Sequence, residues 1–429
     1  MNGVGPKLGQ VALLSLALSF GRGALAQTTT AEVSDRPTIV DTSLGPIVGG
    51  TRYLGLAGAF VAIAEGNEGI AINPASDAVR SGYSWHDFEY GLGIDVSIGA
   101  WLPKNDIYNQ PASSSTTKSS AFFGSLGLNL YYGYAGLGLA AEARGNAATA
   151  QDQAQGASPT SLTANYGMVH ASLAYGFYEG QLVLGAGPRL IGMRLGGGSS
   201  GSSIFNAAGI GYEAGVIVKP HHEQYRIAAA VKAPVTATIA GENGGPATQL
   251  HVPWELALGF AYQFGQRPLN PRLFTVSDYL RQRGGGAGEP TRAETDAAER
   301  HLLERYQSRP RFYVLLTTEL ALVQASNAHV GLNFDDHETT SNRPLVSPRV
   351  GLESEVIPNH LRLRGGSYYE SARVAETNGR FHGTGGLDLR LFEWSVFGLV
   401  KPFDWWQLSL GADAARSYLN TSISIGFWH

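Results

Sequence analysis

The segment Trp85–Leu102 reads WHDFEYGLGIDVSIGAWL, and it decides the fold class because apolar and polar side chains alternate along it. Phe88, Tyr90, Leu92 and Ile94 share one parity, while the other parity carries acidic, small and polar residues. Successive side chains of a strand point to opposite faces, so the pattern predicts a strand with one apolar face. The segment is about three times as long as a typical strand of a soluble sheet. Such a length suits a tilted strand that crosses a bilayer and rises above it.

Alternation of the same kind recurs along the chain, for example in Phe122–Tyr132 and in Trp254–Phe264. Counting such segments predicts an all-β protein, a membrane-spanning antiparallel β-barrel of about fourteen strands. The predicted strands are 83–102, 119–132, 134–144, 163–177, 181–195, 204–219, 224–238, 252–264, 311–324, 345–357, 361–372, 381–391, 393–402 and 415–428.

The connections between these strands alternate between long and short. Segments 103–118 and 145–162 are long, whereas Gly133 and 178–180 are tight turns. Outer-membrane barrels of Gram-negative bacteria have an even strand count, short periplasmic turns and longer extracellular loops. A soluble sandwich has no reason to keep this asymmetry. The pattern therefore favours a barrel of residues 81–429 in the outer membrane, surrounded by its lipid.

Residues 1–26 have the features of a secretory signal peptide. Lys7 precedes a short apolar core, Val11–Phe20, and Ala24-Leu25-Ala26 is a small-x-small cleavage pattern that makes Gln27 the expected mature N-terminus. The alternative, a short anchor helix, is disfavoured because a spanning helix needs about twenty apolar residues.

The composition and motifs exclude several functional classes. The chain of 429 residues contains no cysteine, so disulfides and thiolate metal sites are excluded. A net charge of −4 gives no indication of a nucleic-acid partner. The sequence lacks a nucleophile elbow, an HExxH motif and a phosphate-binding loop, and His221-His222 lacks the further ligands that a metal needs. We therefore expect no catalytic residue, no metal, no cofactor and no enzymatic activity.

Residues 265–310 form a long insertion where a short periplasmic turn is expected. The insertion contains a glycine-rich stretch, Gly284–Gly288, and then Thr291–Tyr306, which is predicted to be a highly charged helix. One interpretation is a solvated flap beneath the barrel. The other is a docking element for a periplasmic partner.

Residues 27–80 precede the barrel and differ from it in character. Segment 43–78 is small, apolar and glycine-rich, without long alternation. Exposing its apolar side chains to water would cost about 25 cal/mol per Å². Folding inside the barrel would bury them, and the glycines permit tight turns and close approach to the wall. We therefore predict a hatch in the lumen.

Two stretches of the chain resemble the FadL-type family of long-chain fatty acid and hydrophobic-compound transporters, including its PorV-like relatives. The run YLGLAGAFVAIA at 53–64, followed by Asn73-Pro74-Ala75, is similar to the family's hatch signature. Segment 348–369 (PRVGLESEVIPNHLRLRGGSYY) is similar to its late hairpin. The turn 65–69 (EGNEG) and Ile72 depart from the family's usual sequence. The resemblance implies a fourteen-stranded barrel with an N-terminal hatch in the lumen.

The resemblance also implies a function, the passive uptake of hydrophobic small molecules such as long-chain fatty acids, gated by the hatch. Carried over position by position, Asn73, Pro74 and Ala75 are the hatch motif, and Gly55 and Gly58 lie in the turn before it. Some relatives serve protein secretion or surface anchoring, so a secretion-system subunit is an alternative. A general porin is another.

Charged residues lie on the polar, inward parity of many predicted strands: Glu213, Lys232, Glu255, Glu319, Arg349, Glu353, Glu355, Arg362, Arg364, Asp388 and Arg390. The plainer interpretation is that they pair with one another inside the lumen. The alternative is that Arg362 or Arg364 binds a ligand carboxylate, because a guanidinium suits bidentate contacts. At the C-terminus, Phe427 or Trp428 is the aromatic residue expected to be recognised by the barrel-assembly machinery.

Overall fold

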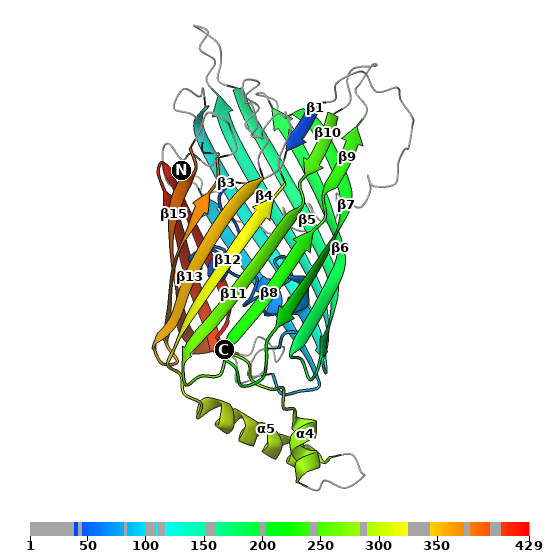
Figure 1. The fold of residues 1–429 in the computed structure, drawn as a ribbon, viewed down its shortest axis with the longest axis vertical. Coiled ribbons are helices and arrows are strands. Elements are labelled where there is room, and N and C mark those ends of the chain that lie inside the picture. The colour runs from blue at the N-terminus through cyan, green and yellow to red at the C-terminus, as the bar shows by residue number, and fades with distance from the viewer. Residues whose placement is uncertain are drawn as a thin grey trace, which may run out of the picture.

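Fourteen antiparallel strands close into a β-barrel in the computed structural model of this chain (Figure 1). The structure describes residues 38–41, 45–80, 84–99, 106, 109, 116–150, 160–197, 202–239, 248–283, 290–324, 344–372, 378–394 and 405–428. The predicted signal peptide at 1–26 and the glycine-rich stretch 284–288 lie outside the described residues.

The barrel is an up-and-down meander in which each strand pairs with its neighbours in sequence and β17 pairs with β2. The strands are β2 (Phe88–Gly99), β3 (Thr116–Tyr132), β4 (Ala135–Ala150), β5 (Thr160–Phe177), β6 (Leu182–Gly197), β7 (Ser202–Val218), β8 (Tyr225–Lys232), β11 (Glu255–Gly265), β12 (Tyr313–Val323), β13 (Leu345–Ile357), β14 (Leu361–Glu370), β15 (Arg380–Glu393), β16 (Trp405–Ala415) and β17 (Tyr418–Trp428). The predicted fold class and strand number are confirmed.

One predicted strand is wrong. The prediction places a strand at 393–402, but the thirteenth strand of the barrel is β16, which begins at Trp405 and pairs with β15 and β17. The alternation in β16 is weak because alanines occupy part of its apolar parity, at Ala412 and Ala414. Residues 395–404 lie outside the described part of the chain.

Two prolines interrupt strands that the sequence predicts to be continuous at 224–238 and 252–264. β8 ends at Lys232, and after Pro234 the chain forms β9 (Val235–Ile239). β9 pairs with β10 (Thr248–Val252), which ends before Pro253, and β1 (Thr38–Asp41) adds to β10 in parallel. Proline has no N–H to donate to a ladder, so the barrel strands stop there. The result is a separate three-stranded sheet at the outer end of the barrel (Figure 1).

The closing pair of the barrel, β17 with β2, is short. Its ladder runs from Thr421–Ile98 to Ile425–Ile94, whereas β2 pairs with β3 along its whole length from Phe88 to Gly99. Within the described strands, the lower part of β2 therefore has a strand partner on one side only.

The outer surface of the barrel is apolar, as the alternation predicts. In β2, Phe88, Tyr90, Leu92 and Ile94 are 57, 55, 51 and 52 % exposed, whereas Asp95 is buried. Exposed apolar side chains on this scale are those of a lipid-facing wall. Among the described helices, none combines the length and the hydropathy of a transmembrane helix.

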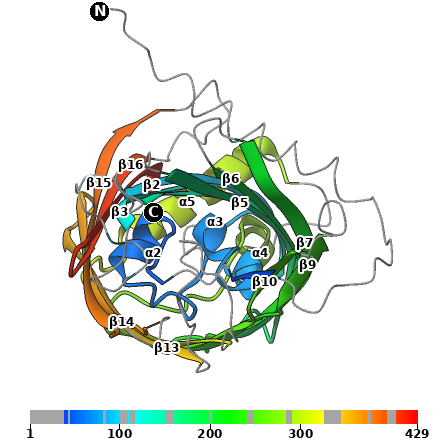
Figure 2. The same cartoon turned by 90° about the horizontal axis from the view of Figure 1, so that it is seen from above.

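The hatch occupies the lumen, as predicted. It comprises α2 (Thr51–Gly55), α3 (Gly66–Gly69) and the 3-10 helix η2 (Pro74–Ala78), all seen inside the ring of strands in Figure 2. Six of its large apolar side chains are at most 1 % exposed: Leu54, Leu56, Phe60, Val61, Ile63 and Ile70. They pack on apolar residues of the wall such as Val183, Ile217 and Leu315.

Glycines in the wall make room for the hatch backbone. A Cβ added at Gly185 of β6 would overlap the carbonyl group of Pro74, and one added at Gly136 of β4 would overlap that of Asp77. The hatch and the wall are therefore complementary in shape at these positions. This complementarity explains why a barrel strand can tolerate glycine at inward positions, where it costs packing and entropy.

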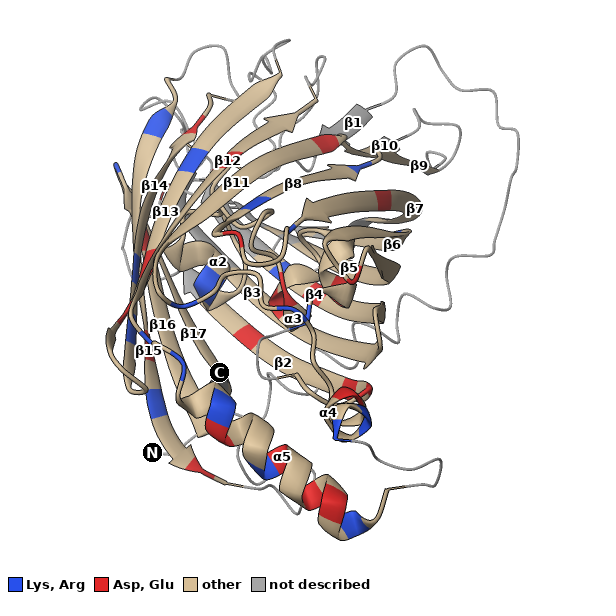
Figure 3. Cartoon of the chain, turned by 60° about the horizontal axis from the view of Figure 1, so that its bottom comes forward, with Lys and Arg blue, Asp and Glu red and all other residues tan. Residues whose placement is uncertain are grey.

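The insertion between β11 and β12 folds into two helices below the barrel, α4 (Val276–Gln282) and α5 (Arg292–Gln307) (Figures 1 and 3). Each begins with a capping box, at Thr275 with Asp278 and at Thr291 with Glu294. Val276, Ala298 and Leu302 form a small core that includes Trp85, just before β2. The sequence does not predict α4. The pair of helices is docked on the barrel through this core and a hydrogen bond from the Val276 N–H to the Trp85 carbonyl.

We predict that Gly185→Ala loosens the hatch without unfolding the barrel. The added methyl group requires the backbone near Pro74 to move, whereas Gly383→Ala, where a Cβ meets nothing within 4 Å, is the matched control. Protease digestion of the folded protein should cut the Gly185→Ala hatch faster than the wild-type hatch, with barrel mobility on unheated gels unchanged. Equal cutting of Gly185→Ala and Gly383→Ala would refute the tight fit.

Candidate functional site

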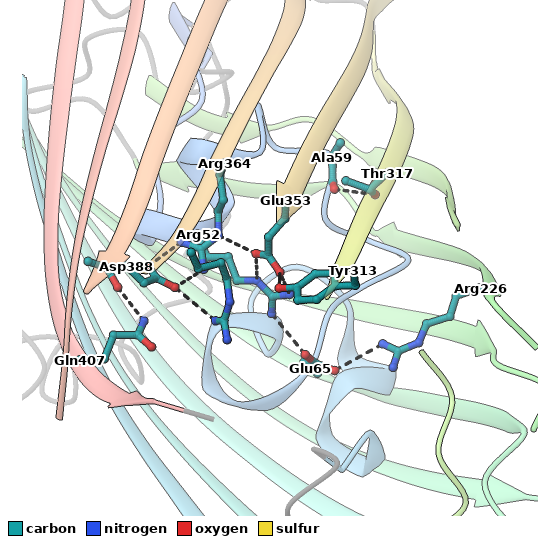
Figure 4. A network of polar contacts seen from close by, with 12 residues as sticks. Arg52, Ala59, Glu65, Arg226, Tyr313, Thr317, Glu353, Arg364, Asp388 and Gln407 are labelled. Carbon is teal, nitrogen blue, oxygen red and sulfur yellow. Dashed lines mark hydrogen bonds and ion pairs between the residues drawn. The ribbon is translucent and has the colours of Figure 1, made fainter. Parts of the chain in front are cut away.

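Glu353 of β13 joins the hatch to the barrel wall (Figure 4). Its carboxylate accepts hydrogen bonds from Nε and Nη2 of Arg52 in α2, at 2.9 and 3.1 Å. Arg364 of β14 donates to the same carboxylate at 2.6 Å, and the Tyr313 hydroxyl donates at 2.8 Å. Arg364 in turn pairs with Asp388 of β15. One buried carboxylate therefore holds the hatch and three wall strands in a fixed geometry.

Glu65 extends this network along the hatch. Its carboxylate lies 3.2 Å from Arg52 Nη1 and 3.4 Å from Arg226 Nη1 of β8 (Figure 4). Desolvation opposes ionisation of Glu65, but the two guanidiniums outweigh it and lower its pKa. Glu65 therefore stays charged and ties the hatch to β8, which only β11 and β12 separate from the strand of Glu353.

A second carboxylate, Glu319 of β12, binds the backbone of the hatch. One of its oxygens accepts the N–H groups of Phe60 and Val61, at 3.0 and 2.9 Å. The Thr317 hydroxyl donates to the Ala59 carbonyl at 2.8 Å. A buried backbone without a ladder of its own must find such partners, so the wall supplies the hydrogen bonds that secondary structure would otherwise provide.

The predicted hatch motif Asn73-Pro74-Ala75 forms a tight capped turn. The Asn73 side chain accepts a hydrogen bond from the Ala75 N–H at 3.0 Å and donates one to the Val61 carbonyl at 3.2 Å. Pro74 lies at the first position of η2, where its missing N–H costs nothing. Asn73 therefore links two parts of the hatch that are twelve residues apart.

The two predicted turn glycines differ in their roles. Gly58 has φ of +68°, which favours glycine, and its carbonyl accepts a hydrogen bond from Arg349 at 3.2 Å. Gly55 ends α2, and its carbonyl accepts one from the Thr384 hydroxyl at 3.1 Å. Both carbonyls are bound by the wall, so both positions lie where the hatch is anchored.

Arg362 and Arg364, the predicted ligand-binding residues, lie in the ion-pair network. Arg364 contacts Glu353 and Asp388 with Nε and both Nη atoms. Arg362 Nη1 lies 3.3 Å from Asp388. The arrangement corresponds to the plainer interpretation, mutual pairing of inward charges, and a role in ligand binding stays a prediction. Other predicted inward charges also pair, Lys232 with Glu255, Arg349 with Glu319 and Glu213 with His170.

Three cavities, named here outer, middle and inner, follow one another along the lumen toward the end of the barrel that carries α4 and α5. The outer cavity, of about 200 Å³, includes Phe123, Tyr166, Met168 and Ile191 in its lining. The middle cavity, of about 310 Å³, lies beneath the hatch and is lined by eight arginines and by Tyr313. The inner cavity, of about 590 Å³, lies between the barrel and the two helices and includes Trp85 and Leu302.

The hatch turn α3 separates the outer cavity from the middle one. Asn67, Glu68, Gly93 and Asp95 line both cavities. The Asn67 side chain packs against the backbone of Gly93 and Gly127, where a Cβ would come within 3.0 Å of the Asn67 Cβ. Desolvation and the neighbouring carboxylate of Asp95 raise the pKa of Glu68 to about 8. Moving this four-residue turn would join the two cavities.

The sequence does not single out Arg52, Glu65, Asn67 or Glu68 as site residues. Their partners are far away in the sequence, as in the pair of Arg52 with Glu353, so only the register of the folded barrel brings them together. The sequence does contain one indication of these residues. They are charged or polar residues in an otherwise small and apolar segment, and they must find partners when that segment is buried.

No metal site is found in the part of the chain that the structure describes, where three His, Asp or Glu side chains nowhere gather around one point. His221 hydrogen-bonds to the Glu179 carbonyl at 3.1 Å, beneath the barrel.

No protein-family model matches the chain, and no curated protein matches it. Solved structures, by contrast, match the chain in fold. A FadL homologue from Pseudomonas aeruginosa is 12 % identical, with a TM-score of 0.51 over 90 % of this chain and 97 % of that one. The monoaromatic hydrocarbon channel CymD is similar to the same degree, 12 % identical with a TM-score of 0.51 over 90 % and 97 % of the two chains. The chain therefore has the FadL-type barrel fold, as the sequence resemblance predicts.

We predict that Glu353→Ala destabilises the protein by about 3–5 kcal/mol, because it leaves buried guanidiniums without their carboxylate. The free energy of unfolding in denaturant, measured in detergent micelles, tests this. Glu179→Ala is the control, since its pair with Arg272 is about half exposed on both sides and should contribute less than about 1 kcal/mol. Equal losses for the two variants would show that Glu353 does not hold the hatch.

Proposed function

We propose that this protein takes up hydrophobic small molecules passively across the outer membrane of a Gram-negative cell, with the hatch as its gate. The observation that carries the proposal is the series of three cavities, of which the outer and the middle one meet at the α3 turn and share Asn67, Glu68, Gly93 and Asp95 in their lining. The names of the solved structures, a FadL homologue and a monoaromatic hydrocarbon channel, support the same class of cargo. A transport role without catalysis agrees with the motifs of the sequence.

The outer cavity suits the capture of an apolar molecule. Aromatic and aliphatic side chains, among them Phe123, Met168 and Ile191, line part of it, and charged side chains such as Glu142 and Arg144 line the rest. Ligand sites are typically apolar with a few fixed polar groups, which orient the ligand. The cargo class we propose is therefore apolar or amphipathic, with long-chain fatty acids as one example.

The gate acts through the hatch residues that the family resemblance identifies. Asn73, Pro74 and Ala75 keep η2 against the wall, while Gly55 and Gly58 allow the turn that precedes α3. In this proposal α3 moves aside as a unit, since it has four residues and no apolar anchor of its own. Arg52 and Glu65, which both precede α3 in the chain, hold the closed state.

The alternatives are a subunit of a secretion or surface-anchoring system and a general porin. The docked helices α4 and α5 are the surface that a periplasmic partner would use. Phe427 and Trp428, the last two residues of β17, are our proposed recognition residues for the barrel-assembly machinery.

Uptake of labelled oleate by Gram-negative cells that lack their own fatty acid transporter tests the proposal. We expect saturable uptake above the empty vector, and a change of several-fold in Asn73→Ala, which loses the hydrogen bonds to Ala75 and Val61. Asn206→Ala, on the exposed part of β7, is the control and should match the wild type.

Absence of uptake, with a folded barrel in the membrane, would reject oleate as cargo. Parallel uptake assays with labelled toluene or a labelled alkane show whether only the choice of cargo is wrong or the proposed function itself. If no apolar cargo enters and a protein co-purifies only when residues 290–307 are present, the secretion-subunit alternative is favoured.

A further inference from the structure

The middle and inner cavities meet at one place, where five residues line both. These are Arg80, Pro268, Pro271, Tyr306 and Arg309. Tyr306 belongs to the last turn of α5, and Arg309 follows the helix directly. The insertion therefore lines the junction, and a molecule that moves from the middle cavity into the inner one passes Tyr306 and Arg309.

Two guanidiniums lie against the ring of Tyr306 at this junction. The guanidinium carbon of Arg311 is 4.9 Å from the ring centroid, and that of Arg309 is 5.8 Å from it. An arginine over an aromatic face is held in place by the quadrupole of the ring. Both arginines also line the middle cavity, so their positive charge faces the route.

The other arginines of the middle cavity are all neutralised by carboxylates: Arg52 and Arg364 by Glu353, Arg80 by Glu89, Arg226 by Glu65, Arg267 by Glu355 and Arg362 by Asp388. Arg309 and Arg311 have no carboxylate partner in the described part of the chain. The Nε of Arg311 is buried there without an acceptor.

Further arginines near Arg309 add to the positive charge that no carboxylate of the described residues neutralises. Burial, and after it the like charges of Arg305, Arg267 and Arg311, lower the pKa of Arg309. An arginine remains protonated in proteins even so, and the cluster is therefore a concentration of positive charge that an anion would relieve. The ordinary role of cations after a helix, to interact with the helix dipole, is already filled by Arg305 in the last turn.

We propose that Arg309 and Arg311, positioned by Tyr306, form an exit site that binds the carboxylate of an amphipathic cargo as it leaves the lumen toward the periplasm. The site rests on the proposed uptake function and specifies its cargo, an apolar chain with an anionic head. Guanidiniums match the planar geometry of a carboxylate and bind it through paired hydrogen bonds. The inner cavity beside the site includes Phe274, Leu273 and Leu302, which suit the apolar chain.

The test compares oleate with oleyl alcohol, which has the same chain and a neutral head. Both are measured as labelled uptake in cells that carry the wild type, the double variant Arg309→Gln/Arg311→Gln, or Arg300→Gln on the exposed face of α5 as the matched control. Loss of a charge-assisted hydrogen bond pair should lower oleate uptake by about tenfold in the double variant. Uptake of oleyl alcohol should stay at the wild-type level, and Arg300→Gln should change neither.

An equal fall for both molecules would assign the arginines a structural role and overturn the site, as would unchanged oleate uptake. Failure of the wild type to take up either molecule would instead reject the proposed function. Equilibrium binding of oleate to the purified full-length protein gives a second measure, with weaker binding expected only in the double variant. Displacement of oleate by lysophosphatidate at lower concentration than by a matched carboxylate would identify a lipid phosphate as the true ligand and overturn the assignment to cargo.

Discussion

The carboxylate of Glu353 is the contact on which the position of the hatch inside the barrel depends. The hatch has little regular secondary structure, so its polar groups must be satisfied by the barrel wall. Glu353 meets this need by binding Arg52 of the hatch and Arg364 of the wall together, with Tyr313 as a third donor. A charge pair of this kind contributes little net stability, but removal of one partner is costly because the other stays buried and unpaired. The pairing therefore specifies one position for the hatch more than it stabilises the fold.

Shape and charge act together to set how firmly each part of the hatch is held in the lumen. Wall glycines let the hatch backbone pack closely at η2, whereas in the α3 turn Gly66, Asn67 and Glu68 are half-buried and only Gly69 is buried. The firmly packed part of the hatch and its least anchored turn are thus adjacent. The outer cavity ends at this turn and the middle cavity begins there. In the proposed function, opening would need a local movement of four residues and would leave the apolar core of the hatch in place, which keeps its energetic cost small.

Much of the fold could be predicted from the sequence, and the site could not. The period-two alternation of residues such as Phe88 and Leu92 predicts both the strands and the face that meets lipid, because it records the pleat directly. The alternation is too weak to predict β16, where alanines occupy part of the apolar parity. It also does not predict the strand breaks at Pro234 and Pro253. The site depends on which strands become neighbours. Arg52 and Glu353 are about three hundred residues apart, and only the closed ring of strands sets them at 2.9 Å. The same holds for the insertion. The sequence shows its charged residues, but it does not show that Arg309 and Arg311 lack a carboxylate partner among the described residues.

A reversible lock on α3 shows whether cargo passes this turn. The chain has no cysteine, and a Cβ at Gly127 lies 3.0 Å from that of Asn67, close to the distance of about 3.5–4.5 Å that a disulfide spans. The double variant Asn67→Cys/Gly127→Cys should take up labelled cargo when reduced and stop when oxidised, with each single variant insensitive to oxidant. Undiminished uptake by the fully oxidised double variant would show that cargo does not pass the α3 turn, and would contradict the account.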